Sequence, residues 1–181
     1  FMCRADILEE LGYKAEDIKN FDDIEEVLKK CQEVHPELYP MIPSDLNNGC
    51  FLNYVKGEFD VVTSGVGVDI DDDASDGITV INTYDTEKYK EMAEKAYDWN
   101  QKGYFMPDST TNTTTRQDLF RANTAFSYYG NQHPGTATQE TMNSGKEIVS
   151  IPIGRSTIST SSVNFCQWAI PAQCENPKKA L

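Results

Sequence analysis

The two histidines of this chain form no recognisable catalytic arrangement. His35 precedes Pro36 at an expected helix end, and His133 precedes Pro134 in an expected turn. Neither has partners at the spacing of a hydrolase triad or a metal-binding motif. The sequence also lacks a P-loop, a G-x-S-x-G elbow and a G-x-G-x-x-G fingerprint. We therefore predict a protein that is not an enzyme and needs no cofactor, although scattered carboxylates leave a carbohydrate-active domain as an alternative.

Binding chemistry is concentrated in one short segment. Tyr128, Tyr129, Asn131 and Gln132 combine two aromatic rings with two planar amides. Sugar recognition needs flat apolar faces to cover C–H groups and placed polar groups to bind ring oxygens, and binding pockets combine the same two elements. One interpretation is a ligand site. The alternative is that Tyr128 shares a buried face with Phe126, while Tyr129 only covers an edge of the sheet.

A second polar set lies nearer the end of the chain. Ser162 and Asn164 belong to a hydroxyl-rich loop and the start of a strand expected over residues 163–171. Phe165 and Trp168 lie in the same strand. Core packing is the favoured role of Trp168, because its neighbours are apolar, but we keep it with Ser162 and Asn164 among the candidate ligand contacts.

An acidic run over residues 69–76 raises the question of calcium, which prefers several oxygen ligands around a sharp turn. The EF-hand pattern requires Gly at its sixth position and Glu at its twelfth. Counting from Asp69 or from Asp71 meets neither requirement. An exposed turn is therefore favoured over a metal site, and we predict no metal ligands.

The elements that must position these residues alternate between helices and strands. Helices are expected over residues 5–11, 23–34, 89–102, 116–123 and 136–142, and from residue 177. Strands are expected over residues 39–42, 59–68, 77–83, 124–129, 147–153 and 163–171, with 59–68 and 77–83 forming a hairpin. This alternation predicts an α/β layer architecture.

Local signals define several of the helix ends. Asp22 followed by Glu25 predicts a helix start of the capping-box type, and Thr115 followed by Asp118 predicts another. Gly103 and Asn123 are expected to end the two central helices, because both residue types tolerate left-handed backbone geometry. Trp99, in the first of these helices, is expected to pack into the core.

Composition bounds the class of protein. The chain has 181 residues with a net charge of −13, a pI near 4.5 and a mean hydropathy of −0.54. This length suffices for one domain with a core. The acidic balance argues against nucleic-acid partners and anionic membrane surfaces, which both require clustered Lys and Arg. The charge is best interpreted as a solubility feature.

The five cysteines are odd in number, so at least one has no partner within the chain: Cys3, Cys31, Cys50, Cys166 and Cys174. No C-x-x-C pair is present, which disfavours zinc and thioredoxin-like chemistry. Cys31 lies on the apolar side of its expected helix and is predicted to be a buried, inert thiol. Pairing of Cys166 with Cys174 stays open.

Both ends of the chain fall inside expected elements. Phe1 begins within a strand, and Leu181 ends one turn into a helix that Asn176 and Pro177 mark as starting. We therefore expect the chain to be a trimmed piece of a longer protein, so the lack of a leader or membrane span carries no information on location.

Three stretches in this order resemble one family. W-x-x-K-G-Y-x-x-P-D ends the central helix and A-F-x-Y-Y-G forms the strand after it. RADILEELGY and FDDIEEVLKKCQEVHPELYP open the chain, and AIPAQCENPKKAL closes it. Together they resemble bacterial extracellular solute-binding proteins of family 1, the substrate-capturing lipoproteins of ABC importers, in their LipO-like branch. The weakest part of the resemblance is residues 49–85.

The resemblance implies a fold and a function. The family has two α/β lobes of the periplasmic-binding-protein type II class, which close over a solute, commonly a mono- or oligosaccharide. Residues 1–181 would form one lobe, the second, with a mixed sheet flanked by helices. The other lobe and the lipid-bearing cysteine would lie outside this chain, at the extracellular face of a bacterial membrane, where the closed protein docks on importer permeases. An interaction module without a small ligand is a further alternative.

Overall fold

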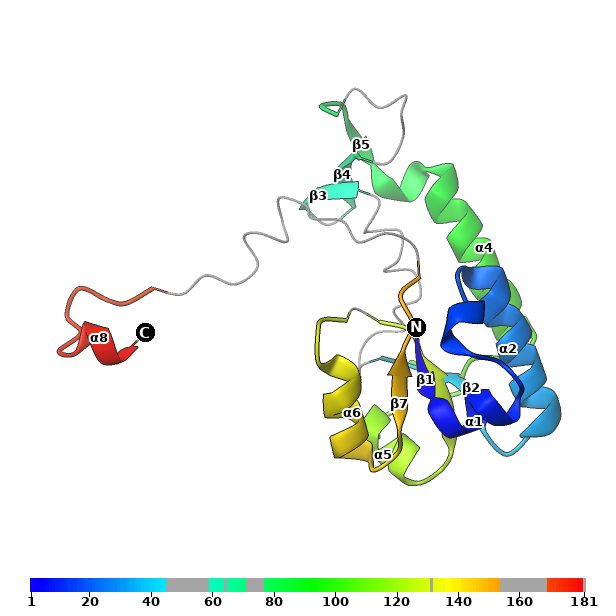
Figure 1. Ribbon diagram of the computed structural model, residues 1–181. Helices are drawn as coiled ribbons and strands as arrows, with labels where there is room; N and C mark the ends of the chain where they lie inside the picture. Colours follow the sequence, from blue (N-terminus) through cyan, green and yellow to red (C-terminus); the bar gives the residue numbers. More distant parts are fainter. Residues whose placement is uncertain (45–58, 64, 71–76, 131, 154–168, 181) are drawn as a thin grey trace.

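The centre of the molecule is a four-stranded mixed sheet (Figure 1). The computed structural model describes residues 1–44, 59–63, 65–70, 77–130, 132–153 and 169–180, with the side chains of 61–63 and 180 excepted. The strands lie in the order β2, β6, β1, β7, which span Tyr39–Ile42, Ala125–Tyr128, Met2–Arg4 and Ile148–Ser150. β2 is parallel to β6, whereas β1 is antiparallel to both β6 and β7. β2, β6 and β7 therefore run in one direction.

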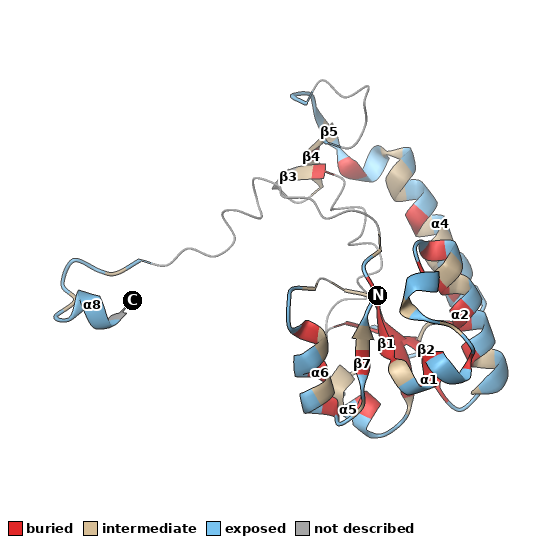
Figure 2. Ribbon diagram, in the orientation of Figure 1, coloured by how far each residue is buried: buried red, intermediate tan, exposed pale blue. Residues whose placement is uncertain are grey.

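Helices cover both faces of this sheet (Figure 1). One face carries α1, α2 and α4, which span Ala5–Glu10, Phe21–Val34 and Glu87–Gln101. The other carries α5 and α6, which span Arg116–Arg121 and Thr136–Ser144. The predicted α/β layers with a mixed sheet are confirmed, because the residues of the two central strands, β1 and β6, point alternately to the two faces and are all buried (Figure 2).

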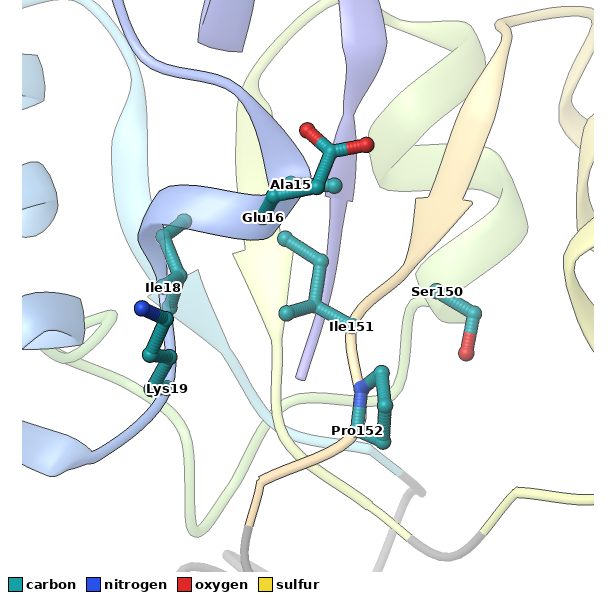
Figure 3. Close-up of a pocket in the computed structure, with 7 residues that line it drawn as sticks. All are labelled: Ala15, Glu16, Ile18, Lys19, Ser150, Ile151 and Pro152. Carbon is teal, nitrogen blue, oxygen red and sulfur yellow. The ribbon is translucent and has the colours of Figure 1, made fainter.

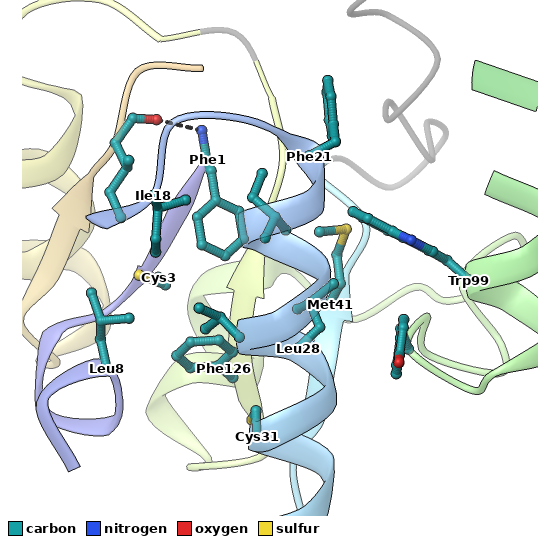
Figure 4. Packing of buried hydrophobic residues seen from close by; sticks show 14 of the residues in the cluster. Phe1, Cys3, Leu8, Ile18, Phe21, Leu28, Cys31, Met41, Trp99 and Phe126 are labelled. Carbon is teal, nitrogen blue, oxygen red and sulfur yellow. Dashed lines mark hydrogen bonds between the residues drawn. The ribbon is translucent and has the colours of Figure 1, made fainter. Parts of the chain in front are cut away.

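The larger core lies between the sheet and α1, α2 and α4 (Figure 4). Phe126 from β6 and Met41 from β2 meet the apolar side of α2 there. That side of α2 consists of Ile24, Val27, Leu28 and Cys31, at helical spacing. Cys31 is fully buried, as predicted, and this burial raises the pKa of its thiol to about 12.

Trp99 joins α4 to this core, as the sequence predicts. Its side chain is fully buried, and its indole Nε1 donates to Glu25 Oε2 of α2 at 2.9 Å. Lys102 Nζ donates to Glu25 Oε1 at 2.6 Å, and Lys95 Nζ lies 3.8 Å from Oε2. Partial burial raises the pKa of Glu25, but hydrogen bonds from Lys102 and Trp99 outweigh it and leave that pKa below its usual value.

The smaller core lies on the opposite face, under α5 and α6. It contains Met2, Ile42, Met106, Leu119, Phe120, Ala125, Tyr128 and Ile148. Phe120 is fully buried and its ring lies 6.1 Å from that of Tyr128. Adjacent residues of one strand thus serve different cores, since Met41 belongs to the larger core and Ile42 to the smaller.

The predicted cap of α2 is wrong. Asn20, not Asp22, caps this helix, because its side-chain oxygen accepts hydrogen bonds from the Asp22 and Asp23 amides. Asp23 Oδ2 in turn accepts from the Asn20 amide at 3.2 Å, which completes a capping box two residues earlier than predicted.

The start of α5 and the ends of α4 and α5 lie where the sequence predicts them. The Thr115 side chain accepts from the Asp118 amide and caps α5. Asn123, with φ of 61°, lies just beyond α5, and Gly103, with φ of 75°, just beyond α4. Residues expected to take left-handed geometry therefore do so at both positions.

A separate three-stranded sheet comprises β3, β4 and β5, which span Phe59–Thr63, Val66–Asp69 and Val80–Asn82. The prediction of one strand over residues 59–68 is wrong, because the chain turns at Gly65, whose φ is 75°. β4 and β5 pair antiparallel, which confirms a hairpin spanning the acidic run. Of that run, residues 71–76 lie outside the described part.

The remaining elements are short. They are 3-10 turns at Ala15–Asp17 (η1) and Thr83–Asp85 (η3), and a helical turn, α8, at Pro177–Ala180 that begins at the predicted position. The expected strand over residues 163–171 lies mostly outside the described residues. In the described part of the chain, no helix has the length and apolar character needed to cross a membrane.

Candidate functional site

Three strand ends meet at one edge of the four-stranded sheet. Because β2, β6 and β7 run in the same direction, Ser44, Gly130 and Ser150 all lie at their carboxyl ends. The amino end of β1 reaches the same edge, where the Phe1 amine donates to the Ile151 carbonyl at 2.8 Å (Figure 4). Ligands of open α/β sheets bind beyond such strand ends.

Tyr129 lies at this edge and is partly buried. Its ring lies 5.4 Å from that of Phe21, at an interplanar angle of 46°. Phe21 is the first residue of α2 and also contacts Trp99, with ring centroids 6.3 Å apart. Tyr129 is therefore supported from the α2 side by two consecutive tilted contacts between aromatic rings.

A hydrogen bond joins Gln132, which follows β6, to Ser150, which ends β7, although β1 lies between these two strands in the sheet. Ser150 Oγ donates to Gln132 Oε1 at 2.5 Å. The Gln132 Nε2 atom is buried and has no hydrogen-bond partner among the described residues. An amide N–H without an acceptor costs about 1–3 kcal/mol. A ligand oxygen that accepted this hydrogen bond would recover that free energy, so Gln132 is suited to recognise hydroxyl or carbonyl groups.

A pocket of about 450 Å³ opens beside Ser150 (Figure 3). Ser150, Ile151 and Pro152 line it where β7 ends, and the segment around η1 supplies Ala15, Glu16, Ile18 and Lys19. The wall is mainly aliphatic, with one carboxylate and one ammonium group among its residues. Ser150 thus belongs both to this pocket and to the hydrogen bond with Gln132.

Tyr128, a predicted ligand contact, lies beneath the edge. Only 2% of its surface is exposed. One neighbour is Phe120 in the smaller core, and the other is the Arg116 guanidinium, 5.0 Å from the ring centroid. Tyr128 is therefore buried, as the alternative interpretation held, but it belongs to the smaller core whereas Phe126 belongs to the larger, so the two do not share one buried face.

The structure describes only two of the other predicted ligand contacts. Tyr129 and Gln132 lie at the edge. Asn131, Ser162, Asn164 and Trp168 lie outside the described residues, so their role stays a prediction. Among the described residues, no group of three or more His, Cys, Asp or Glu side chains is placed to hold a metal ion.

A polar cluster that the sequence analysis missed supports the edge from the α5 and α6 face. Arg116 Nη1 donates to the Ser44 carbonyl, and its Nη2 donates to Glu140 Oε1 at 2.8 Å. Gln117 Nε2 donates to both oxygens of Glu140, at 3.1 and 3.0 Å. The Glu140 side chain is only 4% exposed.

Phe21, Ser44 and Ser150 were missed for one shared reason. Each becomes part of the edge only through strand order, which brings residues from distant segments together. A usable signal did exist for Ser44, which follows the strand predicted over residues 39–42, whereas Ser150 lay in the middle of the strand predicted over residues 147–153 and ends the observed β7. No sequence signal pointed to Phe21, because the start of α2 was predicted one to two residues beyond it.

Comparison with solved structures identifies the fold. An N-glycan transport solute-binding protein, NgtS, from Streptococcus pneumoniae in complex with Man5GlcNAc matches with a TM-score of 0.69 and 20% identity, over 99% of this chain and 38% of its own. A putative binding protein, MsmE, from Bacillus subtilis in an open conformation matches with a TM-score of 0.58 and 16% identity, over 84% of this chain and 38% of its own.

A third match is a sugar transporter from Bacillus licheniformis in complex with stachyose, with a TM-score of 0.56 and 14% identity, over 86% of this chain and 39% of its own. No protein-family model and no curated protein matches the chain. The chain thus spans about two fifths of the length of these structures, or less. At such low identity the likeness shows the fold alone, which this chain shares with these binding proteins, as predicted.

Proposed function

We propose that this chain is one lobe, the second, of a two-lobe solute-binding protein that captures an extracellular carbohydrate for an ABC importer. The ligand, a mono- or oligosaccharide, lies against the carboxyl edge of the four-stranded sheet and is enclosed when the other lobe closes over it. The mechanism is non-covalent, with neither catalytic residues nor a cofactor.

The observation that carries this proposal is the chemistry of the edge. Tyr129 offers an aromatic ring supported by Phe21, and Gln132 offers an amide donor that finds no acceptor among the described residues. Ser150 adds a hydroxyl beside an aliphatic pocket. A sugar needs this combination of apolar surface and directed hydrogen bonds. The solved structures with the same fold include two in complex with oligosaccharides, Man5GlcNAc and stachyose.

If the chain is this lobe, the proposal also covers the other residues of the cleft, the importer partners and the lipid anchor. Asn131, Ser162, Asn164 and Trp168 would complete this lobe's share of the cleft, and Tyr128 would support it from below. The partners would be the permease subunits of the importer. A lipid anchor would lie upstream of this chain and hold the protein at the extracellular face of the membrane, without contact between this lobe and lipid or nucleic acid.

Calorimetric titration of the full-length protein tests the proposal. Man5GlcNAc and stachyose serve as carbohydrate probes, and a neutral tripeptide serves as the control solute. We expect saturable binding of a carbohydrate, with no new product detected by chromatography afterwards. Turnover of a glycoside would instead identify a carbohydrate-active enzyme, and no binding of either carbohydrate would contradict the proposal as stated.

A further inference from the structure

Arg116 connects elements that are distant in the sequence. It is the first residue of α5, and its Nε and Nη2 atoms donate to Glu140 Oε1 of α6 at 3.1 and 2.8 Å. Its Nη1 atom donates to the carbonyl of Ser44, just beyond β2. The guanidinium plane also lies over the ring of Tyr128 in β6, 5.0 Å from the centroid. One side chain therefore contacts α6, the end of β2 and β6.

Glu140 fixes the direction of this guanidinium. Its carboxylate is 4% exposed, and a buried carboxylate requires charged and hydrogen-bonding partners. Gln117 supplies two of the hydrogen bonds, so the carboxylate is held from two sides. The planar fork of arginine can satisfy Glu140 and a carbonyl at the same time, whereas a lysine ammonium acts as a single point charge.

The Ser44 carbonyl is coupled to the segment that carries the candidate ligand contacts. A Cβ atom at Gly130 would lie 3.1 Å from the Cβ of Ser44, so the two backbones approach closely. Tyr129 precedes Gly130 and Gln132 follows two residues later. A shift of Ser44 would therefore change the space available to this segment.

We propose that Arg116 is a positioning residue, which holds the carboxyl ends of β2 and β6 in the arrangement that ligand binding requires. It acts through Ser44 and Gly130 and does not itself touch the ligand. This inference rests on the proposed function, because it assigns a role in shaping the same site.

The test compares Arg116→Lys with Gln117→Ala in the full-length protein. The lysine variant keeps a positive charge beside Glu140 but loses the fork that also reaches Ser44. The alanine variant removes hydrogen bonds to the same Glu140 and leaves Arg116 and Ser44 in contact, so it is the matched control. Each variant is titrated with Man5GlcNAc and stachyose, and its melting temperature is measured.

We expect both variants to melt at lower temperature than the wild type and only Arg116→Lys to bind carbohydrate about tenfold more weakly, the equivalent of one hydrogen bond. Equal affinity of Arg116→Lys and the wild type would overturn the inference. An equal loss of affinity in both variants would also overturn it, because affinity would then follow stability alone.

Hydrogen–deuterium exchange separates this inference from the proposed function. Arg116→Lys is expected to speed exchange in peptides covering residues 39–44 and 126–130, and Gln117→Ala is not. If the wild type binds neither carbohydrate, the proposed function fails while this exchange difference still tests Arg116. Unchanged exchange in Arg116→Lys would show that Arg116 does not hold the strand ends.

Discussion

The two faces of the four-stranded sheet are covered by different chemistry. The face under α1, α2 and α4 packs aromatic and aliphatic side chains against each other, and its main polar group, Glu25, lies toward the outside between helices. The face under α5 and α6 has a smaller apolar core and a buried carboxylate, Glu140, that is linked through Arg116 to a strand end. The first arrangement stabilises the fold, and the second also fixes the backbone at the edge where we locate the ligand.

The largest effect is expected in the apolar face. Phe126 is fully buried in the larger core, so Phe126→Ala should lower the free energy of unfolding by about 3–5 kcal/mol. The urea-denaturation midpoint measures this. Tyr97→Ala, at an exposed aromatic residue of α4, is the control and should change stability by less than about 0.5 kcal/mol. A loss below about 1 kcal/mol for Phe126→Ala would contradict the assignment of this face as the main source of stability.

A smaller and pH-dependent effect is expected at Glu25. Its pKa is lowered in the folded protein, so its contribution is complete above the usual value of 4.5 and is lost as pH falls through the folded pKa. Glu25→Gln should therefore cost about 1 kcal/mol at neutral pH, since the cluster is partly exposed and screened by solvent. The cost should disappear in acid.

Unfolding midpoints at neutral and acidic pH measure this difference, and Glu26→Gln, at the exposed neighbouring position, is the control. If Glu25→Gln cost the same free energy at both pH values, the ion pairs with Lys102 and Lys95 would not be what stabilises this junction.

Local sequence signals predicted the elements better than they predicted the site. The strand over residues 39–42, the Thr115 cap and the left-handed positions at Gly103 and Asn123 follow from short-range chemistry, and the structure has all of them. The errors are also local. Asn20 and Asp22 are both good caps, and the packing of Phe21 decides between them, because Phe21 belongs to the core.

The candidate site depends on long-range order that no local pattern contains. Tyr129 and Gln132 were predicted because aromatic and amide residues followed one strand. Ser150 and Ser44 join them only because β7 and β2 end at the same edge as β6, and the pairing of β1 between β6 and β7 is not visible in hydrophobic periodicity. The Arg116–Glu140 pair likewise joins residues 24 positions apart, on different helices.

The most direct test of the central claim is a calorimetric titration of Gln132→Ala beside Gln139→Ala and the wild type, in the full-length protein with Man5GlcNAc and stachyose. Gln139 is exposed on α6 and serves as the matched control. If the edge binds carbohydrate, Gln132→Ala should bind about tenfold more weakly because one hydrogen bond is lost, and Gln139→Ala should bind as the wild type does. Undiminished binding by Gln132→Ala would contradict the location of the site, and a wild type that binds neither carbohydrate would contradict the proposed capture function itself.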